Sequence, residues 1–183
     1  NVLNWFTANG NISAKIDGAP AIVWGTNPAT NLFFVGTKSV FNKKLIKINH
    51  NHRDIDNNHT GEVANILHHC LDNLPFTTNI YQGDFLGYGG SDNYNPNTIR
   101  YYFQDKVQQE IIIAPHTYYI ADKDLRDAEA FPLEFNLESD NNVLFVKPEC
   151  EITHTDYRQD IIDRCNFARQ VATLCEFPTN TRQ

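Results

Sequence analysis

The segment ISAKIDGAPAIVW, residues 12–24, predicts how the chain begins to fold. Residues 12–17 alternate apolar and polar side chains, which is typical of a strand with one buried face. Gly18-Ala19-Pro20 then predicts a turn, and residues 21–24 form a second apolar run. A third run covers residues 32–37. The three runs together predict an antiparallel meander.

Further along the chain, helical and strand-like patterns alternate. Apolar residues recur at helical spacing from Val63 to Leu74, with Thr60 as the candidate N-cap and Pro75 as the stop. A polar segment, residues 49–59, precedes this helix. Strand-like runs follow at residues 80–88, 99–104, 110–120 and 143–146, separated by a polar loop at 89–97, and an amphipathic helix is expected at about 156–177. Short strands with a few helices predict an α+β fold.

The length of 183 residues predicts a single domain. We expect a strand-rich core in residues 1–150 and a helix with a tail in residues 151–183. The apolar share of 41% and the charged share of 20% exclude a disordered chain, and no apolar run is long enough to cross a membrane. We therefore expect a soluble protein with no membrane partner.

The cysteines favour an intracellular location. They stand at positions 70, 150, 165 and 175, with no Cys-x-x-Cys pair. This spacing argues against a zinc knuckle or redox motif and favours four reduced thiols. No charged and then apolar leader is visible, so we expect a cytoplasmic protein, or one in the host cytoplasm if the source is viral. The oligomeric state is left open.

Lys15-Ile16-Asp17-Gly18 is the first segment that suggests chemistry. Strand alternation places Lys15 and Asp17 on the same face, and Gly18 lets the backbone approach a ligand closely. A lysine becomes a covalent nucleophile when desolvation or nearby positive charge keeps it partly neutral. The alternative is a surface lysine before an Asp-Gly turn.

Two later segments add charged side chains of the kinds that bind phosphate and metal ions. Lys38 ends the third strand-like run, where a lysine reaches phosphate oxygens as a point charge. Asp84 follows Gly83 in a run apolar enough to be buried, and a buried carboxylate needs a metal ion, a lysine or a hydroxyl as its partner. The alternatives are a solvated strand end for Lys38 and a solvent-facing carboxylate for Asp84.

Taken in order, Lys15-x-Asp17-Gly18, Lys38 and Gly83-Asp84 resemble the motifs of the covalent nucleotidyltransferase superfamily. This group contains ATP-dependent DNA ligases, RNA ligases and mRNA capping enzymes. The wording KIDGAPA at 15–21 and FVGTK at 34–38 is most similar to RNA-ligase-like proteins of large bacteriophages. The resemblance implies a ligase-type domain of antiparallel sheets flanked by helices.

The resemblance also implies a lysyl-nucleotide mechanism. Lys15 would attack the α-phosphate of ATP, expel pyrophosphate and carry AMP to a 5′-phosphate end, of RNA in preference to a nicked DNA duplex. GTP is the alternative nucleotide, as in capping enzymes. Mg²⁺ would neutralise charge on the phosphates, with Asp84 as its ligand. The implied nucleotide-binding residues are Ala14, Asp17, Gly18, Lys38, Asp84, Tyr119 and Lys147.

Later motifs of the superfamily depart from its pattern. The aromatic side chain that stacks on adenine has three candidates, Tyr102, Tyr118 and Tyr119, or these tyrosines simply fill the sheet. Residues 142–147 read NVLFVK where the family has Glu-Gly-x-Val-x-Lys, so an asparagine replaces the metal-binding glutamate. Lys147 is the one lysine left of the final Lys-x-Lys motif. The alternative function is therefore a catalytically degenerate module that binds nucleotide or nucleic acid ends, such as a phage accessory or structural protein.

Histidines and lysines gather in the second quarter of the chain. Neighbouring His68 and His69 on the predicted helix point in different directions, and the histidines of residues 49–59 lie in the polar segment, so we predict no zinc site. His116, after Pro115, is predicted to be a turn residue. Residues 18–53 contain five basic and no acidic side chains, although the whole chain carries −7. We expect a local nucleic-acid contact there, or else only a solvated face.

Overall fold

The computed structural model describes residues 19–96, 99–147 and 158–174. The chain divides into two compact units. One unit is Ile16–Glu149, which contains all of the described strands. The other combines Asn1–Lys15 with Cys150–Gln183, and its described part is one helix.

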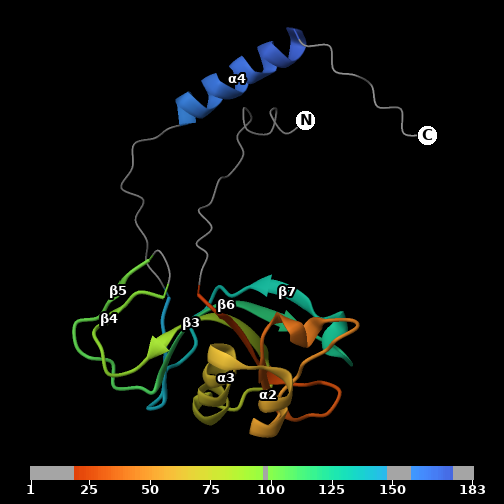
Figure 1. The fold of residues 1–183 in the computed structure, drawn as a ribbon, viewed down its shortest axis with the longest axis vertical. Helices are drawn as coiled ribbons and strands as arrows, with labels where there is room; N and C mark the ends of the chain where they lie inside the picture. Colours follow the sequence, from red (N-terminus) through yellow and green to blue (C-terminus); the bar gives the residue numbers. More distant parts are fainter. Residues whose placement is uncertain (1–18, 97–98, 148–157, 175–183) are drawn as a thin grey trace. The chain divides into compact units, whose positions relative to one another are not determined.

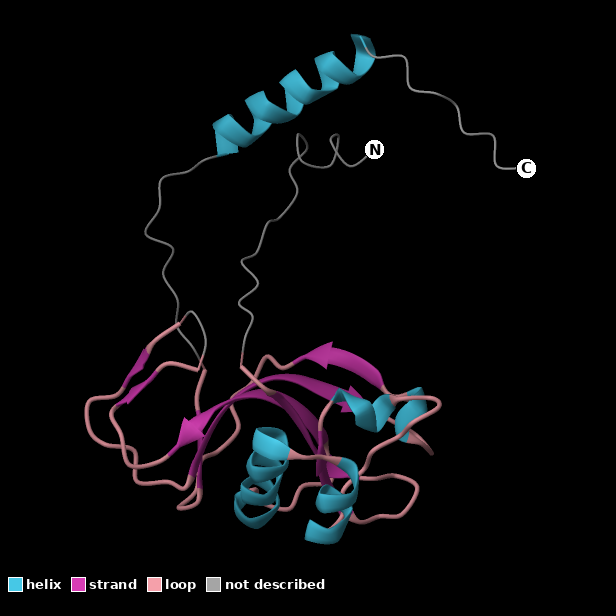
Figure 2. Ribbon diagram, in the orientation of Figure 1, coloured by secondary structure: helices cyan, strands magenta, loops and turns pink. Residues whose placement is uncertain are grey.

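The first unit is built on a sheet of six strands (Figures 1 and 2). The strand order is β2-β1-β3-β6-β7, with neighbouring strands antiparallel, while β8 pairs in parallel with β6. A separate two-stranded sheet pairs β4 with β5. The strands are β1 (Ala21–Thr26), β2 (Phe33–Gly36), β3 (Ile80–Tyr88), β4 (Asn93–Tyr94), β5 (Tyr101–Tyr102), β6 (Ile111–Ile120), β7 (Glu129–Pro132) and β8 (Val143–Phe145).

Two helices, α2 (His52–Asn58) and α3 (Gly61–Asn73), cover one face of this sheet, which we call the helical face. The main hydrophobic core lies between these helices and the sheet. Trp24 on β1 is buried there, with its ring 5.9 Å from the rings of both Tyr81 and Phe145. The helices contribute Ile55, Ala64, Ile66, Leu67 and Cys70 to this core. Burial raises the pKa of the Cys70 thiol, which is free.

The opposite face of the sheet carries two smaller apolar clusters. One cluster joins β1 and β2 to the short 3-10 turns η1 (Lys38–Phe41) and η2 (Leu125–Asp127). The other is centred on Leu86 and Ile112 and packs against the β4–β5 sheet. Because strand residues alternate between faces, Gln82 and Asp84 of β3 belong to this opposite face. Gln82 and Asp84 thus lie on a face of the sheet that also carries these two apolar clusters.

Most of the predicted elements are confirmed, and so is the α+β class at the level of helices combined with antiparallel sheets. The second and third predicted strands pair as β1 and β2, with Val23 opposite Gly36. The predicted strand at 80–88 is β3, and the run at 110–120 is β6. The helix ends as expected before Pro75, and Thr60 is its N-cap, although the Thr60 side chain makes no capping hydrogen bond. The first predicted strand, residues 12–17, lies outside the described residues.

Several elements were not predicted, or were predicted with other bounds. The polar segment at 49–59 contains helix α2, which has a single buried residue, Ile55, and therefore no apolar repeat to reveal it. Its N-cap is Asn51, whose side chain accepts a hydrogen bond from the Asp54 amide at 3.0 Å. The predicted strand at 99–104 shrinks to β5, and its partner β4 lies in a segment predicted to be loop. Strand β7 was not predicted, because its side chains are mostly exposed.

The described part of the second unit is helix α4 (Arg158–Leu174), as the sequence predicted. Pairs four residues apart stabilise it: Arg164 donates to Asp160 and Gln159 donates to Asp163, both at 2.9 Å. Within the part of the chain that the structure describes, no helix combines the length and the apolar character that a bilayer crossing requires.

Candidate functional site

The start of strand β1 is where the chain arrives from the predicted nucleophile motif. Ala14, Lys15, Asp17 and Gly18 lie outside the described residues. Lys15 precedes Ala21 by six positions, and the covalent chain therefore keeps their Cα atoms within about 22 Å of each other.

Lys38 is one neighbour of this position. It lies at the start of η1 and is exposed. It lines an apolar pocket of about 320 Å³ together with Pro20 and Ala21 of the β1 segment and Val63 of α3. Val63 was predicted to be a core residue of α3, but it is 37% exposed because it faces this pocket. Lys38 therefore lies beside the point where the N-terminal segment joins the sheet.

Asp84 is the other neighbour, because it is the register partner of Ala21 across the β1–β3 pair. Its side chain is 33% exposed. Only a glycine fits at position 83, just before Asp84. A Cβ on Gly83 would lie 2.7 Å from the Ala114 carbonyl oxygen and 2.8 Å from the Pro115 Cα. Gly83 thus allows β3 and β6 to approach each other closely just where Asp84 faces solvent.

His116 lies next to Asp84, and the prediction that it is a turn residue was wrong. It belongs to β6, where a bulge opposite Gln82 and Gly83 inserts an extra residue. The bulge brings the His116 Nε2 to 3.6 Å from the Asp84 Oδ1, while its Nδ1 lies 2.7 Å from the Thr117 Oγ1. The signal that was available is Pro115, since a proline inside a strand marks an edge or a bulge.

Tyr119 lies on the same face, nearer to η1. Its hydroxyl donates a hydrogen bond to the Gln82 Oε1 at 2.6 Å, and its ring centroid is 4.3 Å from that of Phe41. Burial raises the pKa of Tyr119. The other two candidates for base stacking lie elsewhere: Tyr118 packs on Phe131 in the helical-face layer, and Tyr102 on β5 is 67% exposed.

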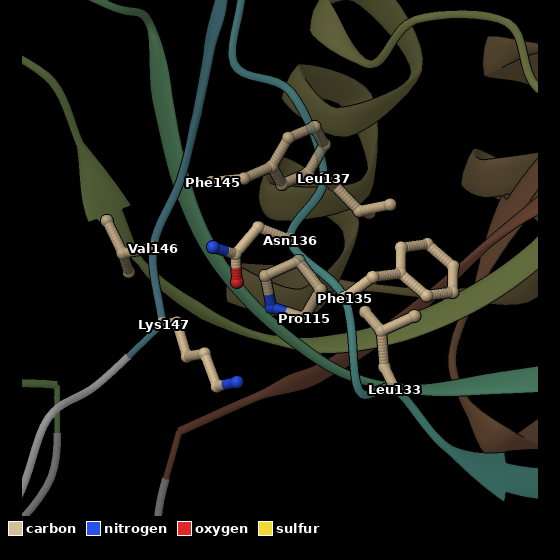
Figure 3. Close-up of a pocket in the computed structure, with 8 residues that line it drawn as sticks. All are labelled: Pro115, Leu133, Phe135, Asn136, Leu137, Phe145, Val146 and Lys147. Atoms are coloured by element: carbon tan, nitrogen blue, oxygen red, sulfur yellow. The ribbon is translucent and has the colours of Figure 1, made fainter.

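Lys147 lines a different pocket from Lys38. It follows β8 and lines a second pocket of about 230 Å³, whose floor includes Pro115 and Phe145 (Figure 3). Phe145 belongs to the helical-face core. Figure 3 shows Lys147 at one end of this group, close to Pro115 and Asn136.

The segment that replaces the family's metal-binding glutamate is a turn. The Asn142 carbonyl accepts hydrogen bonds from the Glu110 and Ile111 amides, and the Asn142 amide donates to the Asp140 Oδ1 at 2.7 Å. Asn142 thus connects β6 to β8. Across the described ranges 19–96, 99–147 and 158–174, no three His, Cys, Asp or Glu side chains are grouped to hold a metal ion.

The basic residues predicted as a contact strip do not share one role. Lys43 and Lys44 lie in an exposed loop, next to Leu45, which is 75% exposed. Lys47 instead donates a hydrogen bond to the Asn58 carbonyl at the end of α2, at 2.9 Å. The loop at 42–46 is therefore anchored by one lysine and displays two others to solvent.

Comparison with known proteins places the chain in a family without assigning an activity. The model of DUF6267, described as a family of unknown function, matches residues 2–181. Neither the curated proteins nor the solved structures contain a significant match.

Proposed function

We propose that this chain, which belongs to the DUF6267 family of unknown function, is a ligase-like adenylyltransferase that forms a lysyl-AMP intermediate on Lys15 and acts on 5′-phosphate ends of RNA. One observation carries the proposal. Lys38 and Asp84 both neighbour Ala21, three positions after the motif Lys15-Ile16-Asp17-Gly18. Lys38 approaches Ala21 through a pocket that α3 also lines, and Asp84 approaches it through the strand register.

The proposed chemistry has three displacement steps, and each one releases a leaving group. The neutral Lys15 amine attacks the α-phosphorus of ATP, the bond to the bridging oxygen breaks, and pyrophosphate leaves with the electron pair. A 5′-phosphate oxygen then attacks the same phosphorus, and the lysine amine leaves. A 3′-hydroxyl completes joining by attack on the activated 5′-phosphate, with AMP as the leaving group. Lys38 would hold phosphate oxygens as a point charge.

Asp84 fits the role of a Mg²⁺ ligand. Its carboxylate is partly exposed and lies 3.6 Å from the His116 Nε2. Mg²⁺ in phosphoryl-transfer sites is commonly held by one or two carboxylates, with substrate phosphates and water completing its shell. When bound, the ion would neutralise charge on the phosphates. His116 would border the same space from β6.

The basic loop supports a nucleic-acid substrate. Lys43 and Lys44 are exposed there, on a chain whose formal net charge is −7. A contact through so few lysines engages few phosphates, and binding would weaken only shallowly as salt rises. The preference for RNA over DNA comes from the phage RNA-ligase-like wording of the motifs.

The test is covalent labelling of the whole chain. Incubation with α-labelled ATP and Mg²⁺, followed by a denaturing gel, is expected to leave an acid-labile label on the protein, because a phosphoramidate is stable to denaturants but not to acid. Labelling with α-labelled GTP in place of ATP would identify a guanylyltransferase of the same superfamily. Absence of label with both nucleotides contradicts the proposed activity.

A second candidate function is a nucleotide-binding or end-binding module without catalysis. One observation favours it: Asn142 stands in a turn where the family has a metal-binding glutamate. This candidate predicts ATP or RNA-end binding by calorimetry with no covalent label. The labelling and binding experiments together therefore separate the two functions.

Asp84→Asn is expected to slow label incorporation about a hundredfold, because the amide preserves the shape of the side chain but removes the charge that would face Mg²⁺ and phosphate. Asp84→Glu restores the residue that is usual in the superfamily and is expected to label at least as fast as the wild type. The measurement is the initial rate of label incorporation, with Asp92→Asn in an exposed loop as the matched control. Equal rates for Asp84→Asn and Asp92→Asn would exclude Asp84 from the site.

A further inference from the structure

Four side chains form a crossed set of hydrogen bonds between α2 and α3, independent of Asp84. Each helix carries a histidine followed four positions later by an aspartate: His52 and Asp56 on α2, and His68 and Asp72 on α3. The Nε2 of His52 lies 2.9 Å from Asp72, and the Nε2 of His68 lies 3.0 Å from Asp56. The two Nδ1 atoms lie 2.7 Å apart. One continuous chain of hydrogen bonds thus joins the two helices.

These hydrogen bonds determine how many protons the two imidazole rings carry. A carboxylate only accepts hydrogen bonds, so both Nε2 atoms must carry a proton to bond Asp56 and Asp72. If neither Nδ1 were protonated, two lone pairs would face each other at 2.7 Å. If both were protonated, two hydrogens would collide. All three contacts are satisfied only when one Nδ1 carries a proton, which gives three protons on four ring nitrogens and one shared positive charge.

The geometry favours a proton over a metal ion between the rings. The ring centroids of His52 and His68 are 5.0 Å apart and the ring planes differ by 23°, so the two Nδ1 atoms meet nearly end-on. Zinc bound end-on between two imidazoles would hold their nitrogens about 4 Å apart, since each Zn–N bond is about 2 Å. The observed separation of 2.7 Å fits a hydrogen bond.

The surroundings of the pair supply charge but no competing proton donor. Asp56 from α2 and Asp72 from α3 are the charged groups that contact the rings, and the His52 side chain is 52% exposed. Strand β2, against which α3 packs, has no titratable side chain. On β6, which α3 also contacts, the titratable residues are His116, Tyr118 and Tyr119, and they contact Asp84, Phe131 and Gln82 respectively.

The other two histidines beside α2 are expected to be neutral. Burial lowers the pKa of His50, against an opposing effect of Asp54. Burial and then the nearby Lys47 charge lower the pKa of His59. Neither His50 nor His59 therefore adds a positive charge beside the pair at neutral pH.

We propose that His52, His68, Asp56 and Asp72 bind a single shared proton that clamps α2 to α3. Loss of this proton at alkaline pH, or gain of a second one at acid pH, breaks the central hydrogen bond and loosens α2. The C-terminal end of α2 holds the basic loop, through the Lys47 bond to the Asn58 carbonyl and the Asn58 bond to Asn49. The protonation state of the clamp therefore controls how firmly the loop carrying Lys43 and Lys44 is anchored.

The direct test is nitrogen NMR of the whole ¹⁵N-labelled chain, which reads the protonation of each ring nitrogen. At neutral pH, both Nε2 atoms and one of the two Nδ1 positions are expected to carry hydrogen, with the Nδ1 proton strongly shifted by the short bond. Observation of two neutral rings, with two protons in all, would overturn the proposal. Zn²⁺ binding at His52 and His68 that displaces this proton at neutral pH would also overturn it, in favour of a metal site.

Hydrogen exchange supplies a second, functional readout. After correction for the intrinsic effect of pH, the α2 amides are expected to exchange slowest near neutral pH and faster on both sides. His52→Gln cannot carry the third proton, and it is expected to speed α2 exchange about tenfold and flatten this pH profile. His69→Gln is the matched control, because the His69 ring packs on Tyr88 rather than on the pair. An unchanged α2 profile in His52→Gln would contradict the clamp.

Discussion

Lys15→Ala is expected to abolish covalent labelling by ATP, with no residual signal above background. Alanine removes the amine that would form the bond to the α-phosphorus, and no other group replaces a covalent nucleophile. Lys15→Arg keeps the positive charge but is equally expected to give no label, because a guanidinium is always protonated and cannot attack. The measurement is the α-labelled ATP gel assay with equal amounts of each protein.

The control is chosen to separate loss of the nucleophile from loss of general positive charge. Lys123→Ala removes an exposed lysine in the segment between β6 and η2, and it is expected to label like the wild type. Circular dichroism of Lys15→Ala is expected to match the wild type, since Lys15 precedes the described sheet. A Lys15→Ala protein that still acquires an acid-labile label would refute the assignment of the nucleophile.

Trp24→Ala is expected to lower the free energy of unfolding by about 3–5 kcal/mol. Trp24 is 1% exposed and contacts the rings of Tyr81 and Phe145 in the core on the helical face. Alanine would leave a cavity between β1 and the helices and remove two aromatic contacts. A loss of this size is a large part of the 5–15 kcal/mol that is typical of a domain, so partial unfolding at 37 °C is expected.

Urea denaturation followed by circular dichroism measures this loss. Leu45→Ala is the matched control because Leu45 is apolar but 75% exposed, and its substitution is expected to change the free energy of unfolding by less than about 0.5 kcal/mol. Similar midpoints for Trp24→Ala and Leu45→Ala would show that the region between β1 and α3 is not the main core.

The elements that the sequence predicted are those in which burial imposes a repeat. Strand β1 is an apolar run because both of its faces are covered, and β3 is mostly apolar and buried. The apolar residues of α3 repeat at helical spacing against the sheet. Helix α2 was not predicted because its one buried residue, Ile55, forms no apolar repeat at helical spacing. The parallel pairing of β8 with β6 is set by contacts between distant segments, which no local pattern encodes.

The candidate site was accessible from sequence only in part. Gly83-Asp84 stood out because a charged side chain interrupts an apolar run, and the structure places it beside Ala21 as a register partner. The approach of His116 to Asp84 depends on a bulge in β6, whose position follows from the pairing of the two strands. The crossed contacts of His52 and His68 were equally hidden, because they require two helices to meet at one particular offset.

The position of β6 in the sheet also bears on how the chain folds. This strand pairs with β3, β7 and β8, and both β3 and β8 are distant from it in sequence. The β1–β2 hairpin forms from neighbouring residues, but the core around Trp24 closes only after β6 and Phe145 have arrived. These distant strands can pair only after long loops have closed, and closing a long loop costs conformational entropy. We therefore expect slow refolding. During synthesis, the edge of β3 that pairs with β6 would stay unpaired until β6 has emerged from the ribosome.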